Sequence, residues 1–192
     1  GDDITIKLYL PLVLRVGLRH DFSQGSLELA YAWEGWKRTE KIEIIPDGIL
    51  IQRAEQEPRN LDTITIQTRL RDTYSFRFGG DYQAIPDLLL VRAGSYYERA
   101  AIGPKRLNVS QFDLDKVGVT AGARVELIAG LFLEVALGYV HWFEVTVSDS
   151  KVMFSDPAPP DPTTVESWPI GNGTYSNTQI FSMAALGGQF DL

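Results

Sequence analysis

The sequence predicts an all-β protein that folds as an antiparallel up-and-down transmembrane β-barrel. Three observations support this fold class. Apolar residues alternate with other residues along most of the 192-residue chain, which is the pattern of strands with one apolar and one polar face. Several alternating stretches run for about 10 to 20 residues, longer than the ~5–6 residues usual in soluble sheets and enough to cross a bilayer when tilted. Short and long connections alternate, as periplasmic turns and extracellular loops do in outer-membrane barrels.

Two strands joined by a tight turn open the predicted fold. Within residues 3–21 every even position up to Leu18 is apolar, which predicts one long strand. Pro11 keeps this alternation but cannot donate a hydrogen bond to a ladder, so we expect a bulge or a local break there. A second alternation covers residues 26–45, and the polar segment 22–25 is short enough to form a hairpin turn.

Five further stretches continue the pattern. Aromatic residues alternate with polar ones in the third strand, and aliphatic residues alternate with glycine, arginine or glutamate in the next three. The seventh alternates isoleucine, alanine and leucine with other residues. These five strands cover residues 63–82, 88–98, 116–127, 131–147 and 174–192. The short connections are 83–87 and 128–130, and the long connections are 46–62, 99–115 and 148–173.

Two folds are compatible with these strands. In a soluble β-sandwich the apolar face is the core and the polar face meets water, whereas in an outer-membrane barrel the apolar face meets lipid and the polar face lines a lumen. Two further features favour the barrel. Charges of both signs occur on the predicted inward face, at Lys7, Arg15, Arg19, Glu28, Glu34, Arg77, Arg92, Arg124, Glu126 and Glu134. Aromatic residues gather near strand ends, as in a membrane-interface girdle, at Tyr31, Trp33, Trp36, Tyr96, Tyr97, Tyr139, Trp142 and Phe143.

Composition excludes several classes of function. The chain has 18 Lys and Arg against 25 Asp and Glu, a net charge of −7, so nucleic acid is not an expected partner. Without cysteine there is no disulfide, thiolate metal site or cysteine nucleophile. The two histidines, His20 and His141, are far apart in the sequence and have no recognisable catalytic or metal-binding partners. We therefore expect no enzyme, no metal and no cofactor.

Six residues of the predicted inward face are candidate ligand contacts. A guanidinium matches the geometry of a ligand carboxylate, but the arginines can equally balance the inward glutamates, and we favour this second interpretation because buried charges are normally paired. The aromatic residues can line an apolar passage, or can pack the lumen and anchor the interface, which is more common. The candidates are Arg77, Arg92, Arg124, Trp36, Phe132 and Trp142.

An ordered series of short motifs resembles the outer-membrane long-chain fatty-acid and aromatic-hydrocarbon transporter family (FadL-like). Leu8–Pro11 is similar to the family's "LPLP"-like strand start, and the strand ending in Trp36 resembles another family landmark. The Asp113-Leu114-Asp115-Lys116 sequence, with glycines after it, resembles a "D-x-D-R…G" loop-to-strand junction. Four more landmarks follow the family order, within 72–82, 90–97, 135–139 and 173–177.

This resemblance implies a specific architecture and function. The family has a 14-stranded barrel with an N-terminal hatch in its lumen. Bacterial single-chain barrels have even strand numbers, so a count of seven means either a miscount by one or, as the resemblance implies, that residues 1–192 are the C-terminal part of one barrel domain without the hatch and first strands. The implied function is passage of long-chain fatty acids or hydrocarbons through the bacterial outer membrane, with membrane lipid and a hydrophobic small molecule as partners. The alternatives are a general or structural outer-membrane barrel and a soluble all-β binding domain. The oligomeric state is not predicted.

Overall fold

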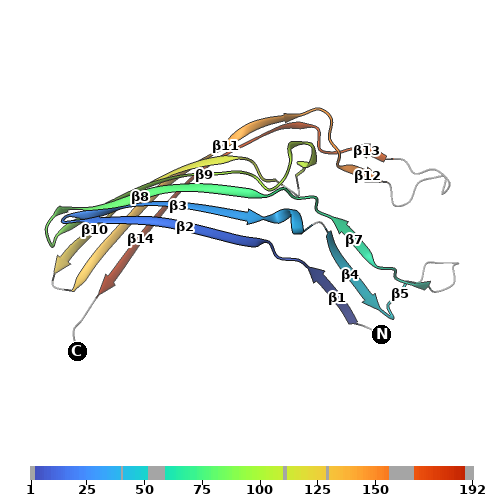
Figure 1. The fold of residues 1–192 in the computed structure, drawn as a ribbon, viewed down its shortest axis with the longest axis horizontal. Coiled ribbons are helices and arrows are strands. Elements are labelled where there is room, and N and C mark those ends of the chain that lie inside the picture. Colours follow the sequence, from blue (N-terminus) through green and yellow to red (C-terminus); the bar gives the residue numbers. More distant parts are fainter. Residues whose placement is uncertain are drawn as a thin grey trace.

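A curved seven-stranded antiparallel sheet dominates the computed structural model, which describes residues 3–39, 41–51, 59–109, 112–128, 130–155 and 167–188. Its strands are β2 (Leu12–Phe22), β3 (Gly25–Gly35), β8 (Thr73–Ile85), β9 (Leu89–Glu98), β10 (Lys116–Ile128), β11 (Leu131–Val147) and β14 (Gly173–Gly188). The spatial order is β14-β11-β10-β9-β8-β3-β2, so each strand pairs with its neighbours in the chain. Figure 1 shows this sheet as a curved wall whose edges, β2 and β14, do not meet. The predicted up-and-down sheet of seven long strands is confirmed, except that residues 189–192 of the last strand lie outside the described residues.

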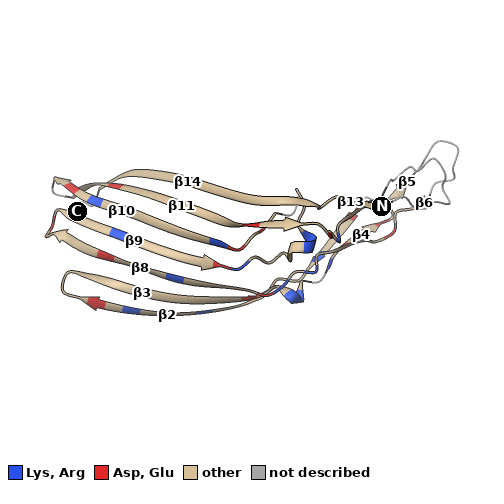
Figure 2. Ribbon diagram, turned by 90° about the horizontal axis from the view of Figure 1, so that it is seen from above, with Lys and Arg blue, Asp and Glu red and all other residues tan. Residues whose placement is uncertain are grey.

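Strand register sorts the alternating side chains onto two faces. On one face, called here the apolar face, Leu29 lies opposite Phe78 and Leu137 opposite Ala121. The other, called the polar face, holds Arg19, Glu28, Arg77, Arg92, Glu98, Lys116, Arg124, Glu126 and Glu134. Figure 2 shows charged positions on every strand of the sheet except β14. Because side chains alternate with a period of two, a slip of one residue would exchange the faces, so the register is strongly specified.

The two faces differ in their exposure. Along β11 the apolar-face residues from Leu133 to Tyr139 are exposed, whereas Gly138 and Val140 of the polar face are buried. A curved sheet shelters the side chains on its inner side, so the polar face is the inner one. The exposed apolar face is the surface that an outer-membrane barrel presents to lipid.

Three neighbouring strands are interrupted at the same level. Beyond β2, β3 and β8, the chain continues as β1 (Asp3–Leu8), β4 (Lys41–Asp47) and β7 (Ile64–Gln67), which form a separate sheet in the order β1-β4-β7. The break predicted at Pro11 is confirmed. The continuous strands predicted over 26–45 and 63–82 are wrong, because each is divided into two strands.

Local hydrogen bonds stabilise this joint. Between β3 and β4 the chain forms a 3-10 turn, η1 (Trp36–Arg38), and Arg69 between β7 and β8 has a positive φ of 46°. The Thr39 hydroxyl donates to the carbonyl of Tyr9, and the Thr68 hydroxyl donates to the carbonyl of Thr39. These side chains take over the role of the ladder hydrogen bonds, as Ser and Thr hydroxyls often do outside regular structure.

The remaining elements lie in the connections. Two small two-stranded sheets, β5 (Leu50–Ile51) with β6 (Arg59–Asn60) and β12 (Met153–Ser155) with β13 (Ser167–Pro169), occur inside segments predicted as long connections. A second 3-10 turn, η2 (Pro104–Arg106), lies in the connection after β9. None of the helices in the described part of the chain has the length and apolar character needed to span a membrane.

Candidate functional site

The polar face carries a ladder of ion pairs between strands. Arg77 lies 3.8 Å from a carboxylate oxygen of Glu98, and Arg92 lies 3.2 Å from one of Glu134. Arg124 lies 2.8 Å from a carboxylate oxygen of Glu126. The register produces the first two contacts by placing arginine and glutamate on the same face of neighbouring or next-neighbouring strands. Arg124 and Glu126 share a face because they are two residues apart on β10. Each of the three candidate arginines is therefore already opposite a carboxylate, as the charge-balancing interpretation requires, while a role in ligand binding stays a prediction.

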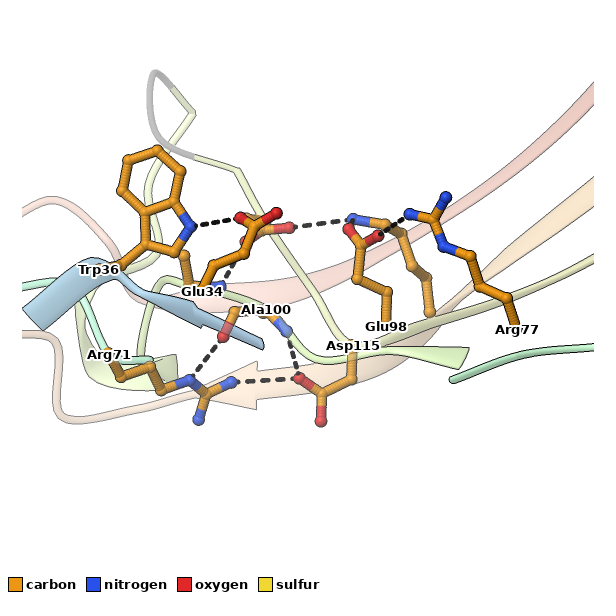
Figure 3. A network of polar contacts seen from close by, with 10 residues as sticks. Glu34, Trp36, Arg71, Arg77, Glu98, Ala100 and Asp115 are labelled. Atoms are coloured by element: carbon orange, nitrogen blue, oxygen red, sulfur yellow. Dashed lines mark hydrogen bonds and ion pairs between the residues drawn. The ribbon is translucent and has the colours of Figure 1, made fainter. Parts of the chain in front are cut away.

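The aromatic candidates occupy three separate environments. The guanidinium of Arg124 lies 3.5 Å above the centroid of the Phe132 ring, a cation–π geometry that engages the ring. Trp142 packs against the buried cluster that contains Leu107 and Leu114. Trp36 belongs to η1, where its indole N–H donates to Glu34 at 2.7 Å (Figure 3). Arg92 and Arg124 both lie within 4.0 Å of Glu134, and Phe132 lies beneath Arg124, so these three candidates are close together. Trp36 and Trp142 lie elsewhere.

Several hollows lie on the polar face, and two of them border Arg92. One of about 320 Å³ is bordered by charged side chains, including Arg19, Arg77 and Asp81. The other, of about 250 Å³, is called here the β11–β14 hollow. It is lined by Thr120, Gly122, Ala136, Met183 and Ala185, with Arg92 and Glu134 also contributing. The second hollow offers apolar surface on the otherwise polar inner side of the sheet.

Sequence reasoning missed the apolar contribution of β14 to the polar face. Phe181, Met183 and Ala185 lie opposite Gly138, Ala136 and Glu134 of β11. A Cβ atom at Gly138 would overlap the Phe181 ring, so the ring lies directly over this glycine. The available signal was that residues 180–186 of β14 are mostly apolar at both odd and even positions, which differs from the other strands.

An ion pair joins two of the long connections, those after β9 and β11, and yields a pH prediction. The Lys105 ammonium donates to a carboxylate oxygen of Asp149, and this hydrogen bond lowers the pKa of Asp149. Because the pKa is lowered in the folded state, the pair is fully present above the ordinary Asp range and is lost only as the pH falls through the lowered value. In an NMR titration the Asp149 midpoint should lie below ~3.9 and should rise in a Lys105→Gln variant. Equal midpoints in the two proteins would contradict the contact.

Comparison with known proteins places this sheet in a family. Residues 1–176 match the model of the family described as "Outer membrane protein transport protein (OMPP1/FadL/TodX)". Among curated proteins no match was found.

The solved structures that share the fold include these three. A Pseudomonas aeruginosa FadL homologue is 20% identical, with a TM-score of 0.65 over 97% of this chain and 38% of its own. The CymD monoaromatic hydrocarbon channel is 14% identical, with a TM-score of 0.54 over 98% of this chain and 38% of its own. The Ralstonia pickettii toluene transporter TbuX is 15% identical, with a TM-score of 0.51 over 97% of this chain and 36% of its own.

These matches show the family of the chain and its membrane environment. It spans somewhat more than a third of the length of the solved structures that it resembles. The family consists of bacterial outer-membrane transport proteins, so the apolar face meets lipid, the polar face meets the lumen, and the alternative of a soluble binding domain is wrong. Since the family match covers residues 1–176 of 192, the chain belongs to the OMPP1/FadL/TodX family of outer-membrane transport proteins.

Proposed function

We propose that this chain forms part of the wall of a barrel through which uncharged hydrophobic small molecules, of the size of aromatic hydrocarbons, cross the outer membrane. The observation that carries the proposal is the β11–β14 hollow, an apolar surface on the inner face. The channels named for monoaromatic hydrocarbons and toluene share the fold and therefore support the same class of molecule. A fatty acid is the second candidate, because the family also includes FadL.

Charge pairing favours the uncharged ligand. A fatty-acid carboxylate would need a cation, and Arg77, Arg92 and Arg124 each lie within 4.0 Å of a glutamate. The ligand would have to compete with a carboxylate that is already held close by the sheet. A hydrocarbon needs no such exchange, since it gains free energy from burying apolar surface alone.

An uptake assay separates the two ligand classes. The protein is expressed in the outer membrane of a Gram-negative host without its own hydrocarbon channel, and uptake of labelled toluene and oleate is measured. We expect toluene uptake well above that of the host and little added oleate uptake. Oleate uptake that matches or exceeds toluene uptake would refute the preference for uncharged ligands. Uptake of sucrose, with no selectivity for apolar molecules, would instead indicate a general pore.

Releasing one arginine should change the ligand preference. In a Glu134→Gln variant, Arg92 loses the carboxylate at 3.2 Å and becomes available to an anionic ligand. Half-exposed ion pairs contribute about 0.2–1 kcal/mol, so we expect oleate affinity to rise by up to about fivefold, with toluene unchanged. Displacement of a bound fluorescent probe by oleate or by toluene, in detergent, measures both affinities. Glu43→Gln, which removes the same negative charge and an ion pair with Lys41 outside the main sheet, is the matched control, and an equal rise there would refute the explanation.

A further inference from the structure

The described residues of the connection between β9 and β10, 99–109 and 112–115, fold onto the inner face of the wall. Its Leu107 and Leu114 side chains are 1% and 2% exposed. They pack with Val147 and against Trp142, Val145 and Tyr175. The strand register places Trp142 on the polar face, and the bulge between Trp142 and Val145 keeps Val145, opposite Tyr175, on that face. The segment therefore covers the lumen side at the end of the sheet that carries the long connections, which is the extracellular end in such barrels.

A polar cluster fastens this segment to a second connection (Figure 3). The Asp115 carboxylate accepts hydrogen bonds from the Ala100 N–H at 2.9 Å, the Arg71 guanidinium at 3.1 Å and the Tyr97 hydroxyl at 3.2 Å. Arg71, which follows β7 in the chain, also donates to the carbonyl of Ala100 at 2.8 Å. One arginine thus joins both ends of the segment, and Asp115 satisfies three donors at once.

Backbone contacts fix the other side of the same segment. The Phe143 N–H of β11 donates to the carbonyl of Asp115 at 2.9 Å, and the Lys151 N–H donates to the carbonyl of Lys105 at 2.7 Å. The segment is therefore attached to the wall and to the connection after β11. An element held by a packed apolar cluster and by hydrogen bonds on both sides cannot yield easily to a passing molecule.

We propose that residues 99–109 and 112–115 form a fixed shoulder that narrows the extracellular entrance. In this proposal Arg71 and Asp115 are the positioning residues that set the size of the molecules admitted. The inference rests on the proposed passage of hydrophobic molecules and adds a limit on their cross-section. Arg71 and Asp115 bind each other and do not contact the ligand. They act by holding Leu107 and Leu114 against the inner wall.

The test compares two uncharged aromatic molecules of different size, toluene and pyrene, in the uptake assay described above. In Asp115→Ala and Arg71→Gln variants we expect pyrene uptake to rise several-fold, while toluene uptake stays close to that of the parent protein. Glu43→Gln serves again as the control for loss of an unrelated ion pair. An unchanged ratio of pyrene to toluene uptake in both variants would overturn the proposal.

A second measurement reports the position of the shoulder without any transport. The chain has no cysteine, so a Leu107→Cys substitution introduces a unique thiol at a buried position. We expect this thiol to react slowly with a water-soluble maleimide, and several-fold faster when Leu107→Cys is combined with Asp115→Ala.

A third experiment closes the segment again by a covalent bond. In a Lys105→Cys, Lys151→Cys, Asp115→Ala variant, oxidation of the two new cysteines to a disulfide should restore the ratio of pyrene to toluene uptake of the parent protein.

The outcomes distinguish this inference from the function on which it rests. Absence of toluene and pyrene uptake in every protein refutes the proposed function, and the maleimide rate still reports whether Asp115 holds the shoulder. A faster maleimide reaction with an unchanged uptake ratio refutes the size limit alone. An unchanged maleimide rate in the Asp115→Ala background refutes the role of Asp115 as a positioning residue.

Discussion

Replacing Leu137 by arginine is expected to lower the free energy of unfolding by about 2–4 kcal/mol, the cost of a cation on the lipid face of a barrel near the bilayer midplane. Leu137 lies in the middle part of β11, is 57% exposed and pairs with Ala121 and Ser182 on the apolar face. In the membrane this exposed surface is covered by acyl chains, which cannot solvate a guanidinium.

The neighbouring residue provides the matched control. Ala136 is on the polar face and contributes to the β11–β14 hollow, near Arg92 and Glu134. Ala136→Arg should therefore cost less than about 1 kcal/mol, because its charge reaches the lumen and a nearby carboxylate. Guanidinium unfolding in phospholipid vesicles measures both variants. Equal losses for the two substitutions would show that the faces are not divided between lipid and lumen.

The second large effect concerns the shoulder. Leu107→Ala should lower the free energy of opening of this segment by about 2–5 kcal/mol, since it removes a fully buried side chain and leaves a cavity. Amide hydrogen exchange at Lys151, whose N–H donates to Lys105, reports this opening. Val109 of the same segment is 93% exposed, so Val109→Ala should change the free energy of opening by less than about 0.5 kcal/mol. Similar exchange in both variants would mean that apolar packing does not hold the segment.

The interrupted strands show where sequence reasoning succeeded and where it failed. Pro11 identified one break because it lacks an N–H group. Within residues 26–45 the apolar residues change from odd positions, such as Leu29, to even ones, such as Ile44, and this change was the overlooked sign of the 3-10 turn. Within 63–82 the apolar residues keep even positions on both sides of the break, so the alternation contains no signal. There the interruption depends on the positive φ of Arg69 and on the hydrogen bond from the Thr68 hydroxyl to the carbonyl of Thr39, between η1 and β4.

The candidate site was predictable only in part, for a similar reason. The period of two by itself placed Arg77, Arg92 and Arg124 on one face. Their partners depend on which strands are adjacent: Arg92 reaches Glu134 across an intervening strand. Trp142 occupies an even position of β11, like the lumen-facing residues that precede it in this strand, yet Leu107 and Leu114 pack against it.

The sequence by itself determined the all-β class, the seven membrane strands and the division into an apolar and a polar face, because these follow from backbone geometry within each strand. Only the tertiary structure decided the ion pairs, the joint across three strands and the shoulder over the inner face. Each of these depends on residues far apart in the chain, such as Arg71 and Asp115, whose approach is set by sheet register and loop packing. Local alternation carries no information about such long-range contacts.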